Sequence, residues 1–120
     1  MSIGAPLHKH THEDEISYVL EGVLSVIQDG VKQTARAGEF IVKPRGKWHT
    51  FWNATPDRIR FLEIIVPGNF EGYYAEIAPF LPAGQPPLTG NLKEVAMKYG
   101  LSTDPQATEI LIREEGLKLL

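Results

Sequence analysis

The chain has 120 residues and a net charge of −3 at neutral pH, so it lacks the basic footprint of a nucleic-acid-binding protein. With 42% hydrophobic and 22% charged residues, its composition is that of one globular domain. The absence of cysteine excludes disulfides and thiolate metal sites, and it fits the cytoplasmic location that we expect. We see no secretion signal and no apolar run long enough to cross a bilayer, so no membrane partner is expected.

The first half of the chain is rich in strand signals. Its apolar runs are short, contain many β-branched and aromatic residues, and are separated by turn-forming residues. They predict strands over residues 16–20, 23–27, 40–42, 48–52 and 59–66. Asp29-Gly30 predicts a tight hairpin between residues 23–28 and 31–36, because both turn residues tolerate positive φ. Strands at this spacing indicate an all-β sandwich or small barrel.

Beyond Pro67 the pattern changes. We expect a short helix near residues 75–80, an irregular loop over 81–90 and a helix over 91–99 that Gly100 ends. Asp104-Pro105 predicts the start of a last helix, since proline is tolerated in a first helical turn. The expected apolar stripe of this last helix is Ile110, Leu111, Leu117 and Leu120. We therefore divide the chain into a β core over 1–70 and an extension over 71–120, packed on the core or on a partner subunit.

Three of the four histidines and one glutamate have the spacing of metal ligands. His8 and His10 are two residues apart, so in an extended strand both imidazoles point to the same face. Glu15 follows after enough chain for a bend, and His49 lies in a later aromatic strand, close after Pro44. Three imidazoles and one carboxylate would suit a divalent transition metal such as Fe, Mn, Co, Ni, Cu or Zn.

Other interpretations of these polar residues are open. His8, His10 and His12 could form a solvated polar stretch, and His49 could be a core histidine with satisfied hydrogen bonds. We place His12 at the rim of the site rather than among the ligands. The acidic side chains that follow it, Glu13 and Asp14, could orient the imidazoles, but a solvated turn is the more common role for such a pair.

Two motifs make the chain resemble the cupin superfamily. The first, H-x-H-x(3,4)-E-x(6)-G, is matched by His8, His10, Glu15 and Gly22. The second, G-x(5)-P-x-G-x(2)-H-x(3)-N, is matched by Gly38, Pro44, Gly46, His49 and Asn53. The resemblance covers roughly residues 4–70 and looks closest to small single-domain cupins of the quercetin-dioxygenase-like kind. It implies a small antiparallel jelly-roll barrel, with the glycines in turns and Asn53 at a turn or strand end.

By this resemblance the metal lies inside the barrel, held by His8, His10, Glu15 and His49. The activity implied is dioxygenase-like, on an aromatic or enolisable small molecule. We expect Glu15 to act as proton acceptor, because a carboxylate ligand can loosen and take a proton from a substrate hydroxyl. A non-oxidative isomerase, lyase or cyclase and a non-catalytic binding protein are the alternatives, because cupins include all three. Aromatic side chains that could line the substrate pocket, or simply pack in the core, are Phe51, Phe61, Phe70, Tyr73 and Tyr74. Alternation along the strand points Trp48 and Trp52 away from His49, toward the tail or a subunit partner.

One departure from similar cupins concerns the N-terminus. His8 follows Met1 closely, whereas such cupins usually carry earlier strands before the first motif. A barrel without those strands would expose an unpaired edge, which proteins normally cover. We therefore expect the protein to be a homodimer.

Overall fold

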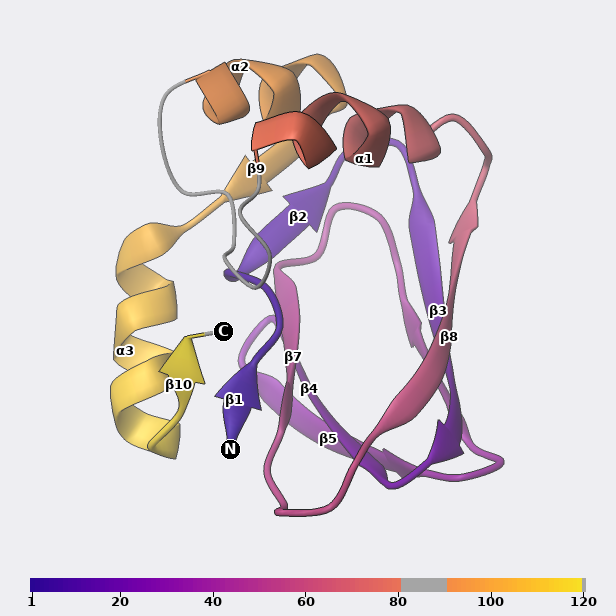
Figure 1. Ribbon diagram of the computed structural model, residues 1–120, viewed down its shortest axis with the longest axis vertical. Coiled ribbons are helices and arrows are strands. Elements are labelled where there is room, and N and C mark those ends of the chain that lie inside the picture. Colours follow the sequence, from indigo (N-terminus) through magenta and orange to yellow (C-terminus); the bar gives the residue numbers. More distant parts are fainter. Residues whose placement is uncertain (81–90, 120) are drawn as a thin grey trace.

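Residues 1–80 and 91–119 are described by the computed structural model, and they form two facing β-sheets with helices at one end and along one side (Figure 1). The larger sheet contains β1 (Ser2–Ile3), β2 (His8–His10), β4 (Val23–Gln28), β5 (Val31–Arg36), β7 (His49–Asn53), β9 (Leu101–Thr103) and β10 (Lys118–Leu119). The smaller sheet has the order β6-β3-β8, with β3 (Asp14–Glu21) between β6 (Phe40–Lys43) and β8 (Arg60–Val66). All pairings are antiparallel except that of β1 with β10.

The predicted all-β jelly-roll architecture is confirmed, with each predicted strand present. At the hairpin, Asp29 and Gly30 have φ values of 43° and 82°, so both turn residues adopt the positive φ that the sequence predicts. Asn53 caps the end of β7, where its side chain accepts from the Thr55 backbone N–H at 3.0 Å and donates to the Asp57 carbonyl at 2.7 Å. Strand alternation in the sequence thus located the sheets correctly.

The helices are α1 (Glu71–Ile77) with a 3-10 turn at Ala78–Phe80, α2 (Asn91–Lys98) and α3 (Pro105–Glu115). The first helix begins earlier than predicted, and the loop predicted over 81–90 lies outside the described residues. The last helix begins at Pro105 as predicted, and Asp104 caps it, because its carboxylate accepts the Ala107 backbone N–H at 2.9 Å. None of these helices is long and apolar enough to cross a membrane.

The apolar stripe predicted for the last helix is only partly correct. Leu111 is buried, and Leu117 is buried just beyond the end of the helix, where both pack with Ile3 and Trp52. The assignment of Ile110 to this stripe is wrong, because its side chain faces solvent. Leu120 lies outside the described residues. Trp52 therefore packs on the C-terminal extension. Trp48 instead contacts Lys9, whose ammonium lies 4.8 Å from the centroid of the Trp48 ring.

The prediction of an unpaired sheet edge near the N-terminus is also wrong. The C-terminal extension supplies β9, which pairs with β2, and β10, which pairs with β1. In Figure 1 these strands lie beside the N-terminal strands, and the described ends of the chain come close together. The edge is therefore covered by the chain itself, and it gives no reason for a dimer.

Candidate metal centre

The four predicted ligand residues meet between the two sheets. His8 lies opposite His49 where β2 pairs with β7, and His10 follows on the same face of β2. Glu15 reaches the group from β3 in the smaller sheet. One ligand atom from each residue can be chosen so that all four lie within 4.8 Å of one another.

In His8 and His49, the Nδ1 atom of the imidazole has a backbone carbonyl as acceptor, which sets the orientation of the ring. His8 Nδ1 lies 2.7 Å from the Pro6 carbonyl and His49 Nδ1 lies 3.3 Å from the Lys47 carbonyl, so in each ring Nδ1 carries the proton and donates. This arrangement leaves Nε2 of both rings facing the cluster, as the nitrogen that could bind a metal. Histidine ligands commonly have their second nitrogen held in this way.

Glu15 lies at the centre of the cluster. One carboxylate oxygen is 2.9 Å from His10 Nε2, and the other is 2.9 Å from His49 Nε2 and 3.2 Å from Lys43 Nζ. Burial alone would raise the pKa of this carboxyl, but the two imidazoles and the Lys43 charge outweigh it and hold the pKa well below its usual range. Glu15 is therefore ionised, as a metal ligand must be.

His8 is held in the neutral form. Burial, together with repulsion from His49, lowers the pKa of His8 to about 3. A neutral imidazole has a lone pair on Nε2 available for coordination. The environment thus favours the protonation states that a metal requires at both His8 and Glu15.

The donor set fits a divalent transition metal. Two ligand atoms on opposite sides of such an ion lie about 4.2 Å apart, so atoms already within 4.8 Å need only small shifts to bind it. Both ring nitrogens of His10 are buried and have no well-aligned hydrogen-bond partner among the described residues, which is costly unless something else satisfies them. A metal bound at Nε2 would satisfy one of them.

The sequence analysis missed a buried ion-pair network beside the ligands. The Lys43 side chain has 0% exposure, and its ammonium lies 2.8 Å from Glu63 as well as 3.2 Å from Glu15. Ser17 donates to Glu63 at 2.9 Å. Strand alternation could have revealed this network, because Lys43 is two residues from buried Ile41, and Glu63 is two residues from each of the inward-facing Phe61 and Ile65 in β8.

The acidic neighbours of the ligands have different environments. Glu13 is buried with its carboxylate 3.5 Å from His10 Nδ1, so the solvated-turn interpretation is wrong for this residue. Asp14 does lie at the surface, in a bidentate ion pair with Arg45. His12 is exposed beside Gly100 and outside the ligand cluster, as predicted.

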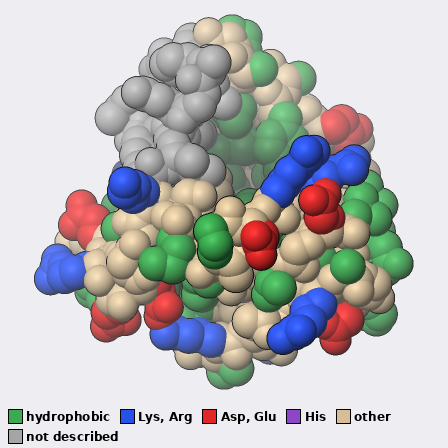
Figure 2. Space-filling model, turned by 60° about the horizontal axis from the view of Figure 1, so that its bottom comes forward, with side chains coloured by type: hydrophobic (Ala, Val, Ile, Leu, Met, Phe, Trp, Pro, Cys, Tyr) green, Lys and Arg blue, Asp and Glu red, His purple; other side chains and the backbone are tan. Residues whose placement is uncertain are grey.

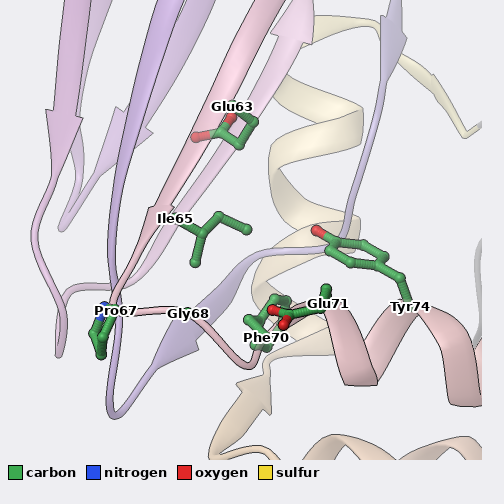
Figure 3. Close-up of a pocket in the computed structure, with 7 residues that line it drawn as sticks. All are labelled: Glu63, Ile65, Pro67, Gly68, Phe70, Glu71 and Tyr74. Carbon is green, nitrogen blue, oxygen red and sulfur yellow. The ribbon is translucent and has the colours of Figure 1, made fainter.

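A cavity of about 160 Å³ lies between the end of β8 and α1, close to the ligands. Its lining residues are Glu63, Ile65, Pro67, Gly68, Phe70, Glu71 and Tyr74. Glu63 and Ile65 extend from β8, and Tyr74 extends from α1 with its hydroxyl leading into the space between them (Figure 3). The Phe70 ring packs edge-to-face against the His10 imidazole, with 4.6 Å between ring centroids. This contact connects the cavity wall to the ligand cluster.

The five aromatic candidates fall into two groups. Phe70 and Tyr74 line the cavity, and Tyr73 stacks on Phe70 from behind it. Phe51 and Phe61 instead pack against each other in the apolar cluster at the opposite end of the interior. Among the described residues, the aromatic candidates that line this cavity are therefore those near α1.

Comparison with known families agrees with this geometry. Residues 2–65, more than half of the chain, match the family model described as "Cupin domain". The chain belongs to the cupin family. The glycines of its cupin motifs serve the predicted turns, since Gly22, Gly38 and Gly46 have φ values of 77°, 87° and 80°. At Gly22 an added Cβ would clash with the Arg58 carbonyl oxygen, so space also requires glycine there.

The relatives of this cupin carry different activities. It is 40% identical over 57 residues to acetate kinase EutQ of Clostridioides difficile, covering 48% of the chain and 35% of that protein. It is 40% identical over 50 residues to oxidoreductase iacF of Pestalotiopsis fici, covering 41% and 24%. A solved sugar phosphate isomerase of the cupin superfamily from Silicibacter pomeroyi has 26% identity and a TM-score of 0.50, covering 55% and 43%. The chain thus spans from 24% to 43% of these relatives' lengths.

Proposed function

We propose that this cupin is a metal-dependent enzyme acting on a small enolisable or aromatic molecule. The observation that carries the proposal is the convergence of three imidazoles and Glu15 beside a cavity that contains further proton-carrying groups. Clusters of ionisable groups with perturbed pKa values, next to a cavity, are typical of active sites. A structural ion-pair network alone would not need a cavity.

The cavity volume favours a small substrate. A cavity of 150 Å³ accommodates a benzene molecule, so the volume of about 160 Å³ suits a single ring or a short chain of similar size. The cavity is partly open to solvent, so a three-ring flavonol would extend out of it. We therefore propose single-ring or short-chain molecules as the substrates to test.

The polar residues have distinct roles in this proposal. A bound divalent metal would supply Lewis acidity that favours loss of a proton from a substrate hydroxyl or from a carbon beside a carbonyl. Tyr74 lines the cavity and would donate a hydrogen bond to the substrate. Its side chain is half exposed, and partial burial together with the charges of Glu15 and Glu63 raises its pKa to about 12. Its phenol therefore stays protonated at neutral pH.

The sequence analysis predicts that Glu15 accepts the substrate proton. Contacts with His10, His49 and Lys43 hold the Glu15 pKa well below its usual range, and a carboxylate of low pKa is a weak base. Glu63 offers a second carboxylate that lines the cavity directly. We propose that Glu63 accepts the substrate proton and that Glu15 acts as ligand.

Two reactions can follow proton removal. Dioxygenation, which the sequence resemblance implies, consumes O2, whereas isomerisation returns the proton to a different carbon. The second reaction is favoured by the cavity's own donor and acceptor, Tyr74 and Glu63, and by the likeness to the sugar phosphate isomerase from Silicibacter pomeroyi. Glu63 and Glu71 make the lining acidic, which disfavours a phosphorylated substrate and favours a neutral one.

The test uses the metal-reconstituted protein with single-ring phenols and short hydroxy-ketones. Proton removal predicts deuterium incorporation from D2O, measured by NMR, and dioxygenation predicts O2 uptake at an electrode. Glu63→Gln should reduce exchange at least tenfold, while its cavity neighbour Glu71→Gln retains it. Ligand binding without exchange or O2 uptake at any metal loading would overturn the enzyme assignment and leave a binding protein.

A further inference from the structure

Glu13 is a buried acidic side chain without a basic partner. On the face that Figure 2 shows, acidic side chains lie at the surface, several of them beside a lysine or an arginine. Glu13 is only 7% exposed, and the ion pairs of the described residues join it to no lysine or arginine. Burying a carboxylate costs free energy unless a hydrogen-bond donor satisfies it, so this position calls for a donor.

The group that faces Glu13 is the imidazole of His10. Glu13 Oε2 lies 3.5 Å from His10 Nδ1, and both atoms are buried without a well-aligned hydrogen-bond partner among the described residues. His8 and His49 differ in this respect, because their Nδ1 atoms lie 2.7 Å and 3.3 Å from backbone carbonyl oxygens. At His10 a side chain takes the place of that carbonyl.

The backbone holds this pair in place. At the end of β2 the His10 carbonyl accepts the Gly46 N–H at 2.8 Å, and the Thr11 N–H donates to the Gly100 carbonyl at 3.0 Å. The two residues after His10 are exposed, and the chain then turns inward, so that Glu13 is buried just before β3. The contact is therefore built by the turn between β2 and β3, whose backbone is anchored to two other segments.

His10 also has a carboxylate at its other nitrogen, since Glu15 lies 2.9 Å from Nε2. A neutral imidazole carries a single ring proton. On Nε2 this proton would face Glu15 and occupy the position that a metal needs, whereas on Nδ1 it would face Glu13 and leave the Nε2 lone pair free. The two glutamates therefore favour opposite tautomers of the same ring.

We propose that Glu13 is a positioning residue, which accepts the Nδ1 proton of His10 and so holds the ring in the tautomer that binds a divalent metal. The proposal rests on the metal centre of the proposed function and is independent of the reaction. A carboxylate that accepts a hydrogen bond from a ligating imidazole also makes that imidazole a stronger ligand. Glu13 thus raises the metal affinity without touching the metal.

Titration of the metal-free protein with Zn²⁺ against a chelating indicator tests the effect on affinity. Glu13→Gln keeps the size of the side chain but removes its charge, and it should raise the Zn²⁺ dissociation constant at least about tenfold. Asp14→Asn is the matched control, because it removes the same charge from the adjacent residue, which pairs with Arg45 at the surface. It should bind Zn²⁺ as the wild type does.

Three results of this titration would contradict the proposal. An unchanged affinity in Glu13→Gln would show that the contact with His10 has no effect on binding. Equal weakening in Glu13→Gln and Asp14→Asn would assign the effect to net charge. A wild type that binds no Zn²⁺ would overturn the metal centre together with this proposal, whereas the first two results leave the metal centre intact.

NMR of the histidine side chains tests the tautomer directly, and a chain with only four histidines makes their assignment simple. In the Zn²⁺-loaded wild type, His10 should carry its proton on Nδ1. Metal-free Glu13→Gln should hold more of the Nε2–H tautomer than the metal-free wild type, because the amide can donate to Nδ1, while its circular dichroism spectrum stays the same. The same His10 tautomer in both proteins would overturn the proposal. So would a His10 Nδ1 proton that, in the Zn²⁺-loaded wild type alone, exchanges with water as fast as the ring protons of exposed His12.

Discussion

The interior between the sheets has a polar end and an apolar end that are built from the same strands. β3 contributes Glu15 to the first and Val19 to the second, and β6 contributes Lys43 and Ile41 in the same way. The apolar end gains stability from burial alone. The polar end contains buried charges, which are costly unless they are paired, so its groups stabilise one another and hold the ligands in position. The two ends should therefore respond differently to substitution.

The largest effect is expected for His49→Ala at the polar end. This variant removes one of the four ligands, so metal binding should be lost, as measured by elemental analysis after reconstitution and desalting. His12→Ala is the matched control, because His12 is an exposed histidine outside the cluster, and it should keep the metal content of the wild type. Unchanged metal content in His49→Ala would show that the site assignment is wrong.

The second prediction concerns the buried ammonium. Lys43→Met leaves the Glu15 and Glu63 carboxylates buried without their cation, and breaking a buried pair in this way costs about 3–5 kcal/mol. Urea unfolding of the metal-free protein should show this loss. Saturating metal should restore part of it, because a dication neutralises Glu15, and Lys43→Met with Glu63→Gln should lose less than Lys43→Met alone. A loss below about 1 kcal/mol would mean that the network contributes little.

The apolar end should lose stability without losing metal. Leu24→Ala removes a fully buried side chain from the cluster with Val19 and Val26, which costs about 2–5 kcal/mol. The metal content per folded molecule should stay at the wild-type level. Val31→Ala, at an exposed position on the neighbouring strand, should change the free energy of unfolding by less than about 0.5 kcal/mol. Metal loss from folded Leu24→Ala would show that the two ends are coupled.

The sequence predicted those features that depend on local periodicity. Alternation placed the strands, and the two-residue spacing of His8 and His10 placed both imidazoles on one face. The tail strands β9 and β10 were missed because segments of two or three residues have no detectable alternation. Lys43 was missed because lysine is almost never fully buried, although its position in β6 points inward. Features that need long-range pairing thus required the structure.

The smallest effect is the pH dependence of the metal-free protein. The folded state holds His8 neutral, with a pKa of about 3, whereas in the unfolded chain it titrates near 6.5. Below pH 6.5 the unfolded state therefore binds more protons, and stability falls as the pH falls. Each pH unit between these values changes the stability by up to about 1.4 kcal/mol, so His8 alone should remove about 2 kcal/mol by pH 5. Glu15 acts in the same direction at lower pH, because its folded pKa is depressed and its stabilising contribution is lost as the carboxylate is protonated. Urea unfolding between pH 5 and 7.5 should show this slope in the wild type and in His12→Gln, and a weaker slope in His8→Gln. A slope that is the same in His8→Gln as in the wild type would assign the pH dependence to groups outside the ligand cluster.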